Sequence, residues 1–64
     1  MLLKKIETAL NKQIRIEAES SQVYLSMACW AEIQGLEGVA QFMYRQSDEE
    51  RLHMLKLIKY VEKT

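Results

Sequence analysis

The chain has 64 residues and a mass of 7.5 kDa, and 48% of its residues are apolar and 28% charged. A chain of this length forms one domain at most, and its nine basic and nine acidic side chains favour neither a nucleic-acid partner nor a membrane partner. No apolar stretch has the length of a membrane span or a secretory signal, and the single Cys29 excludes an intramolecular disulfide. We therefore expect a cytoplasmic protein that gains stability from a metal ion or a partner chain.

Two long helices are predicted on either side of the one segment that contains glycine. The segment Gly35-Leu36-Glu37-Gly38 separates two stretches without Gly or Pro that are rich in strong helix formers. We predict a helix over about Leu3 to Gln34, a turn over 35–38 and a second helix over about Gly38 to Lys63. Gly35 suits the left-handed residue that follows a helix end. The expected fold is all-α, an antiparallel hairpin that forms half of a four-helix bundle.

The first predicted helix has a polar side and an opposite side with a heptad pattern. The polar side chains recur at spacings of three and four: Lys4, Thr8, Lys12, Arg15, Glu19, Gln22 and Ser26. The opposite side carries two seven-residue series, Leu3, Leu10, Glu17, Tyr24 and Ala31, and beside them Ile6, Gln13, Ser20 and Met27. We interpret both series as the face that packs on the second helix. Glu17 is the exception, because it places a carboxylate where an apolar side chain is expected.

The second predicted helix repeats this exception. Its packing face is formed by two series, Met43, Glu50 and Leu57, and beside them Ser47, Met54 and Val61. His53 follows Glu50 by three residues and so lies on the same side of the helix. The opposite side is solvated, with Gln41, Arg45, Asp48, Lys56 and Lys59. We therefore predict that Glu50 and His53 point toward the first helix.

Further apolar rows lie outside the predicted packing face of both helices. They are Ile14, Ala18, Leu25 and Cys29, then Ile16, Val23 and Trp30, and in the second helix Tyr44, Leu52 and Leu55. A single hairpin buries only one face, so these rows predict contacts with other chains and a homo-oligomer.

Two carboxylates and one imidazole meet at the predicted packing face. A buried ionised carboxylate is strongly unfavourable unless it is paired or binds a cation, and the basic residues line the outer faces. In a hairpin that turns near Leu36, Glu17 and the Glu50–His53 pair fall at about the same level. The Glu-x-x-His spacing lets one helix offer an oxygen and a nitrogen to one ion, and a ligand set without sulfur fits a divalent transition metal better than a structural zinc.

These residues stand in an order that resembles a known family. Glu17, Ser20-Ser21 and Tyr24 are followed by Leu36-Glu37-Gly38 and then by Glu49-Glu50-Arg51-Leu52-His53-Met54. Over essentially its whole length the chain resembles the first half of a prokaryotic non-haem ferritin, with its first two helices and their turn. The ligand pattern is itself part of this resemblance, because ferritin-like bundles combine a Glu from each of two helices with Glu-x-x-His from each of the other two.

The resemblance implies a ferroxidase that oxidises Fe(II) with dioxygen at a di-iron site and stores ferric mineral. Glu17 and His53 would bind the first iron, and Glu50 would bridge both irons. Tyr24 would stand beside the iron pair in a redox role, and Glu49 would bind an accessory third iron. Haem is not expected, because Arg51 occupies the position where the haem-binding branch has methionine.

Family chains contain two further helices with the remaining ligands, so this chain carries half of the set. Three explanations stay open: a truncated ferritin, a fragment that no longer oxidises iron, or two copies that restore the full set about a two-fold axis. We favour a fragment whose ferroxidase activity is impaired unless a dimer completes the site. Two other functions stay open, a metal-free hairpin in which Glu17 and Glu50 fix the packing register, and a di-iron protein of rubrerythrin type.

Overall fold

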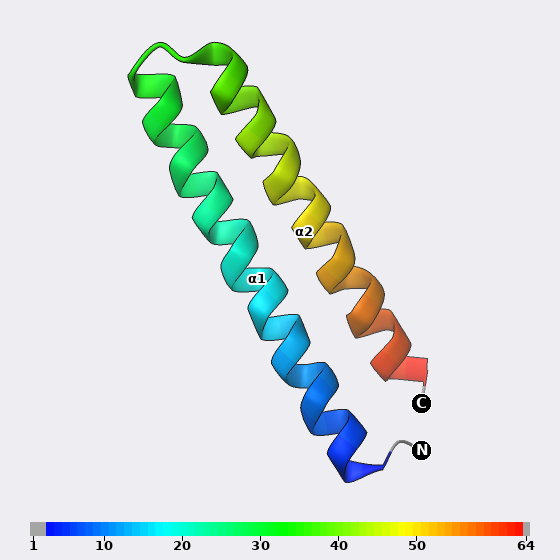
Figure 1. Cartoon of the computed structure of the whole chain (residues 1–64). Coiled ribbons are helices and arrows are strands. Elements are labelled where there is room, and N and C mark those ends of the chain that lie inside the picture. Colours follow the sequence, from blue (N-terminus) through cyan, green and yellow to red (C-terminus); the bar gives the residue numbers. More distant parts are fainter. Residues whose placement is uncertain (1–2, 64) are drawn as a thin grey trace.

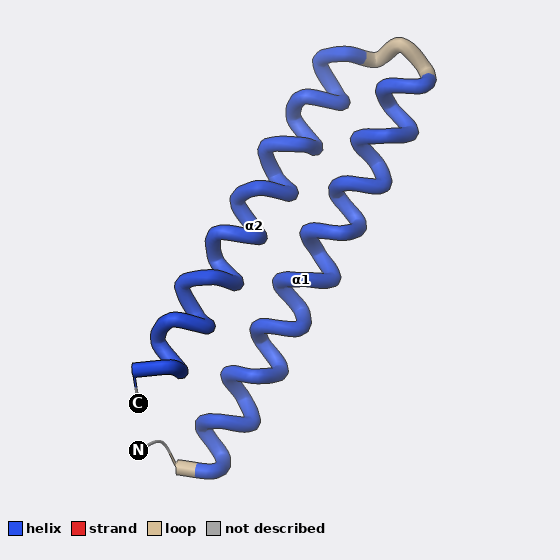
Figure 2. The backbone as a smooth tube through the Cα atoms, turned by 180° about the vertical axis from the view of Figure 1, so that it is seen from behind, coloured by secondary structure: helices blue, strands red, loops and turns tan. Residues whose placement is uncertain are grey.

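The chain folds into two antiparallel α-helices that lie side by side along their whole length (Figure 1). The computed structural model describes residues 3–63, with α1 at Lys4–Ile33 and α2 at Glu37–Lys63. Figure 2 shows the same pair from behind, with the turn at one end and the ends of the described chain at the other. The hairpin measures 49 × 15 × 10 Å. The predicted all-α antiparallel hairpin is confirmed, although α1 is one residue shorter at each end and α2 begins one residue earlier than predicted.

The turn between the helices is built on backbone hydrogen bonds that end α1. Leu36 N–H donates to the carbonyl of Ala31 at 2.8 Å, and Gly35 N–H donates to that of Glu32 at 3.0 Å. This pair of bonds is the Schellman motif, which needs a left-handed residue after the helix end. Gly35 supplies it with a φ of 77°. The turn therefore returns the chain antiparallel within a few residues.

The two helices touch through small side chains. The buried residues in the described part of the chain are Ser21, Ala28, Ala31, Ala40 and Ser47. Ser21 Oγ donates to the carbonyl of Ser47 at 3.0 Å, and Ser47 Oγ donates to the carbonyl of Ser21 at 2.9 Å. Because each hydroxyl reaches the backbone of the other helix, the two backbones approach closely at this level. These bonds also satisfy the buried hydroxyls, which would otherwise cost free energy.

The predicted packing face of α1 is half right. Leu10, Glu17 and Tyr24 are half-buried and Ala31 is buried, as the first heptad series predicts. Of the second series, Ser20 is half-buried, but the prediction is wrong for Ile6, Gln13 and Met27, which are exposed. The residues one position later are Ile14, which is half-buried, and Ser21 and Ala28, which are buried. Ile14, Ala18 and Leu25, which were predicted to contact other chains, are half-buried in the hairpin itself. The reason is geometric: a heptad pattern gives the average apolar direction of a helix, and the contact with α2 is only part of that face.

Many large apolar side chains remain exposed. Ile16, Val23 and Trp30 on α1 are 40%, 58% and 58% exposed, and Leu52 and Leu55 on α2 are also exposed. No large side chain is fully buried in residues 3–63. A lone hairpin therefore lacks a core of large residues, and it leaves apolar surface for further helices to cover. Neither described helix is long and apolar enough to span a membrane.

Near the turn, a hydrogen bond joins the two helices by their side chains. The Tyr44 hydroxyl donates to Glu32 Oε2 at 2.5 Å. This bond to a carboxylate favours the protonated phenol and raises the pKa of Tyr44 to about 12. We expect Glu32→Ala to lower the pKa of Tyr44 toward its ordinary value of 10.0, measured as phenolate absorbance in a pH titration. Glu37→Ala, on the same end of the hairpin, is the control, and an unchanged Tyr44 pKa in Glu32→Ala would contradict this assignment.

Candidate metal centre

Three of the predicted ligands meet between the helices. Glu17 from α1 and Glu50 and His53 from α2 each offer one ligand atom, and these atoms lie within 4.8 Å of one another. The Glu17 side chain is 15% exposed and that of His53 is 54% exposed, so the cluster is covered by the hairpin on one side and open on the other. The dry setting expected for Glu17 is thus only partly realised, because a single hairpin covers one flank of the site.

The two carboxyl groups influence each other's protonation. The hydrogen-bonding interaction with Glu50 lowers the pKa of Glu17, and the same interaction raises the pKa of Glu50. These opposite shifts are those of two carboxyl groups close together, of which Glu17 loses its proton before Glu50 does. A bound cation would relieve the repulsion between the two carboxylates once both are ionised.

The distances suit a single bound ion. His53 Nδ1 lies 3.7 Å from Glu17 Oε2. Ligand bonds of about 2.1 Å let one transition-metal ion bridge two atoms that are up to roughly 4.2 Å apart. All ligand atoms of the cluster lie within 4.8 Å of one another, which is close to this range. Two carboxylates and one imidazole leave the coordination of iron incomplete, so further ligands must come from water or from another segment.

Gln13 forms a hydrogen bond with Glu17, and it was not predicted as a site residue. Its Nε2 donates to Glu17 Oε1 at 3.1 Å, which leaves Oε2 directed toward His53. Partners of this kind orient metal ligands and tune their affinity. The spacing of four residues between Gln13 and Glu17 on one helix was the signal that could have revealed this contact.

No lysine or arginine competes for the carboxyl pair in residues 3–63. The ion pair that involves such a residue is between Arg15 and Glu19, at 4.0 Å, and both side chains are exposed. The prediction that the basic residues lie away from Glu17 and Glu50 is consistent with this arrangement. The neutralising groups within reach of the pair are therefore a proton, His53 or a bound cation.

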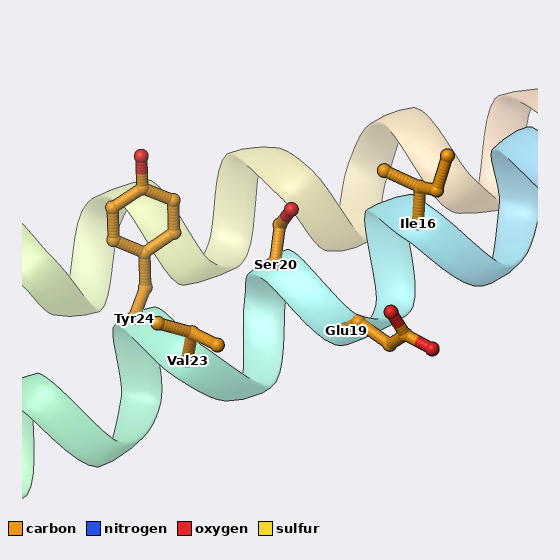
Figure 3. A pocket seen from close by; sticks show the side chains of 5 residues that line it. All are labelled: Ile16, Glu19, Ser20, Val23 and Tyr24. Carbon is orange, nitrogen blue, oxygen red and sulfur yellow. The ribbon is translucent and has the colours of Figure 1, made fainter.

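The remaining two predicted site residues lie outside the three-residue cluster. Tyr24 is half-buried on α1, and Figure 3 shows it pointing to the same side as Ser20 and Ile16, along a shallow hollow. Glu49 is exposed on α2, beside Glu50 in sequence. The redox role of Tyr24 and the accessory iron role of Glu49 stay predictions.

Carboxylates and histidine on facing helices are the residues with which one class of helical-bundle proteins forms metal sites. The family model described as "Ferritin-like domain" matches residues 7–64. The chain belongs to this ferritin-like family.

Several curated proteins are similar to the whole chain. It is 41% identical over 64 residues to the "Probable bacterial non-heme ferritin-like protein" of Haemophilus influenzae, a match that covers 100% of this chain and 39% of that protein. It is 40% identical to the "Bacterial non-heme ferritin" of Bacteroides fragilis and 38% identical to that of Campylobacter jejuni, with 98% and 100% of this chain covered and 40% and 38% of those proteins. The chain thus spans about two fifths of the length of these relatives. No solved structure matches it significantly.

Proposed function

We propose that this chain carries the iron-binding half of a cytoplasmic, oligomeric iron-storage protein, and that Glu17, Glu50 and His53 bind Fe(II) as a substrate. The observation that supports this most directly is the convergence of three ligand atoms from two helices within 4.8 Å. The names of the relatives as non-heme ferritins support the same metal.

The proposed reaction is the oxidation of Fe(II) by dioxygen. Two Fe(II) ions each give one electron to one dioxygen molecule, which takes up two protons and leaves as hydrogen peroxide, with two Fe(III) ions for storage. Glu50, which offers a carboxylate oxygen to the cluster, would bridge the ions, and Glu17 and His53 would hold the first of them. Tyr24 would act as the nearby redox residue, and Glu49 would bind an accessory ion.

Anaerobic titration with Fe(II), followed by addition of oxygen, tests this function. We expect saturable Fe(II) binding and then the growth of ferric absorbance at a rate above that of iron in buffer alone. Glu62→Ala serves as the control, because Glu62 is an exposed carboxylate near the end of α2 and away from the cluster. Absence of saturable binding in the unmodified chain would refute the proposal.

The metal-free hairpin is the second candidate function, and one observation favours it. His53 Nδ1 lies 3.7 Å from Glu17 Oε2, and Glu17 raises the pKa of Glu50, so the carboxyl pair has a partner within its own chain without any ion. In that case Glu17→Leu with Glu50→Leu would raise stability and leave assembly intact, whereas our proposal requires the same double variant to lose iron binding. The distinction from a di-iron protein of rubrerythrin type depends on segments outside these 64 residues.

A further inference from the structure

We propose that the first half of α1 carries a binding site for a tetrahedral oxyanion, with inorganic phosphate as its ligand, in a surface hollow lined by Thr8, Asn11, Lys12 and Arg15. We call it the α1 hollow. Its volume of about 350 Å³ has room for one such ion together with several water molecules, each of which occupies about 30 Å³ in the liquid. The inference is independent of the proposed function, because none of these residues belongs to the metal cluster.

Helical periodicity brings the four lining side chains together. Positions 8, 11, 12 and 15 are three or four residues apart, so they lie on one side of α1 over two turns. At 3.6 residues per turn this side is opposite to Glu17, which is half-buried toward α2. All four side chains are exposed. A dissolved ion therefore reaches them directly from solvent.

Every side chain that lines the α1 hollow donates hydrogen bonds. A hydroxyl, an amide, an ammonium group and a guanidinium group meet there, and no carboxylate from residues 3–63 lines it. These are the groups with which proteins contact phosphate oxygens in nucleic acids. Two other hollows on the hairpin have a different chemistry, because one is lined by Glu19 and the other by Glu32 and Glu37. Their carboxylates would repel an anion, so the α1 hollow is the better candidate.

The two cationic side chains of the hollow are available to a ligand. Lys12 forms no ion pair with any side chain of residues 3–63, and Arg15 forms a loose one, with Nε 4.0 Å from Glu19 Oε1 and side chains 71% and 70% exposed. Exposed ion pairs contribute little free energy. This pair also engages one of the five N–H groups of the guanidinium. The others can form two parallel hydrogen bonds to an oxyanion, with Lys12 as a second positive charge.

Positive charge is concentrated around the hollow although the chain as a whole is neutral. The stretch from Lys4 to Arg15 contains four basic residues and one acidic residue, Glu7, whereas the chain has nine of each. The antiparallel hairpin places the last turn of α2, with Lys59 and Lys63, at the same end of the molecule (Figure 1). A local excess of positive charge raises the concentration of anions near the surface. This end of the hairpin therefore attracts the ion that the hollow binds.

A phosphate titration of the isotopically labelled chain, followed by nuclear magnetic resonance, tests the inference without any iron. Sodium phosphate is added at constant pH, and sodium chloride keeps the ionic strength constant. We expect saturable shifts of the backbone amides of residues 8–15 and of the Asn11 side-chain amide. Sodium sulfate, a second tetrahedral oxyanion, should compete with phosphate. Sodium chloride alone should give no saturable shift.

Two variants of the hollow and one matched control separate a built site from general electrostatic attraction. Arg15→Gln should weaken phosphate binding by about 5-fold, the upper range for an exposed charge pair. Arg45→Gln removes the same charge from an exposed arginine of α2 and should leave the affinity unchanged. Thr8→Val keeps every charge and has a similar helix propensity, and we expect about 3-fold weaker binding from the lost hydrogen bond.

Three results would overturn the inference. The first is the absence of saturable shifts at constant ionic strength, and the second is shifts confined to residues 56–63, which would place the anion on the lysines of α2. The third is equal weakening by Arg15→Gln and Arg45→Gln, or no weakening by Thr8→Val, since either would reduce the effect to the charge of the chain. Each of these results leaves the proposed iron site untouched.

Discussion

Replacing Glu50 by alanine is expected to weaken Fe(II) or Co(II) binding by about 100-fold or more, because it removes the carboxylate that faces both Glu17 and His53. Even residues that only orient metal ligands change affinity by about 10- to 100-fold, so the loss of a ligand has at least the larger effect. Alanine is the strongest helix former, so α2 should stay intact. Isothermal titration calorimetry under anaerobic conditions measures the effect, and circular dichroism reports the helix content.

The pH dependence of binding gives this prediction a second readout. The pKa of Glu50 is raised by Glu17, so a proton on Glu50 competes with the metal ion up to a higher pH than at an ordinary carboxyl group. Metal ligands must lose their protons, and affinity in the unmodified chain therefore rises with pH until Glu50 is fully ionised. Glu50→Ala removes this part of the pH dependence. The exposed Glu62→Ala variant should match the unmodified chain in both affinity and pH profile. Equal affinities for Glu50→Ala and Glu62→Ala would remove Glu50 from the site.

The helices and the turn could be predicted from sequence because their signals are local. Gly35 stands as an isolated helix stop between two long runs of helix formers, and its positive φ is the property that only glycine adopts without strain. The convergence of Glu17, Glu50 and His53 was also predictable, because an antiparallel hairpin with a tight turn fixes which levels of the two helices face each other. Predicting that these three side chains meet required only the periodicity of each helix and the position of one turn.

The exact contact line between the helices was not predictable in the same way. A heptad pattern gives the average apolar direction of a helix, and in a bundle that direction points between two neighbours. Ser21 and Ala28 are buried against α2, whereas Ser20 is half-buried and Met27 is exposed. Gln13 was missed for a related reason: it was assigned to the packing face, whereas it is exposed and turns along its own helix toward Glu17.

Ser47→Leu is expected to lower the free energy of unfolding by about 3 kcal/mol, the largest effect on stability that the hairpin predicts. Forcing extra methylenes into a close contact costs about 1–3 kcal/mol, and losing a buried hydrogen bond costs roughly 1 kcal/mol more. Ser47 is 2% exposed, and its hydroxyl reaches the carbonyl of Ser21 on α1. Urea denaturation followed by circular dichroism, at one fixed protein concentration, measures the change.

The matched control for this experiment is Ser26→Leu, which makes the same replacement on an exposed position of α1. It should stay within about 0.5 kcal/mol of the unmodified chain, as surface substitutions do. Ser47→Ala separates the two causes, because it removes the hydrogen bonds without adding volume, and we expect a loss of about 1 kcal/mol. If Ser47→Leu lowered the free energy of unfolding no more than Ser47→Ala, the helices would have room for a larger side chain at this level. The close approach that aligns Glu17 with Glu50 would then not depend on the two serines.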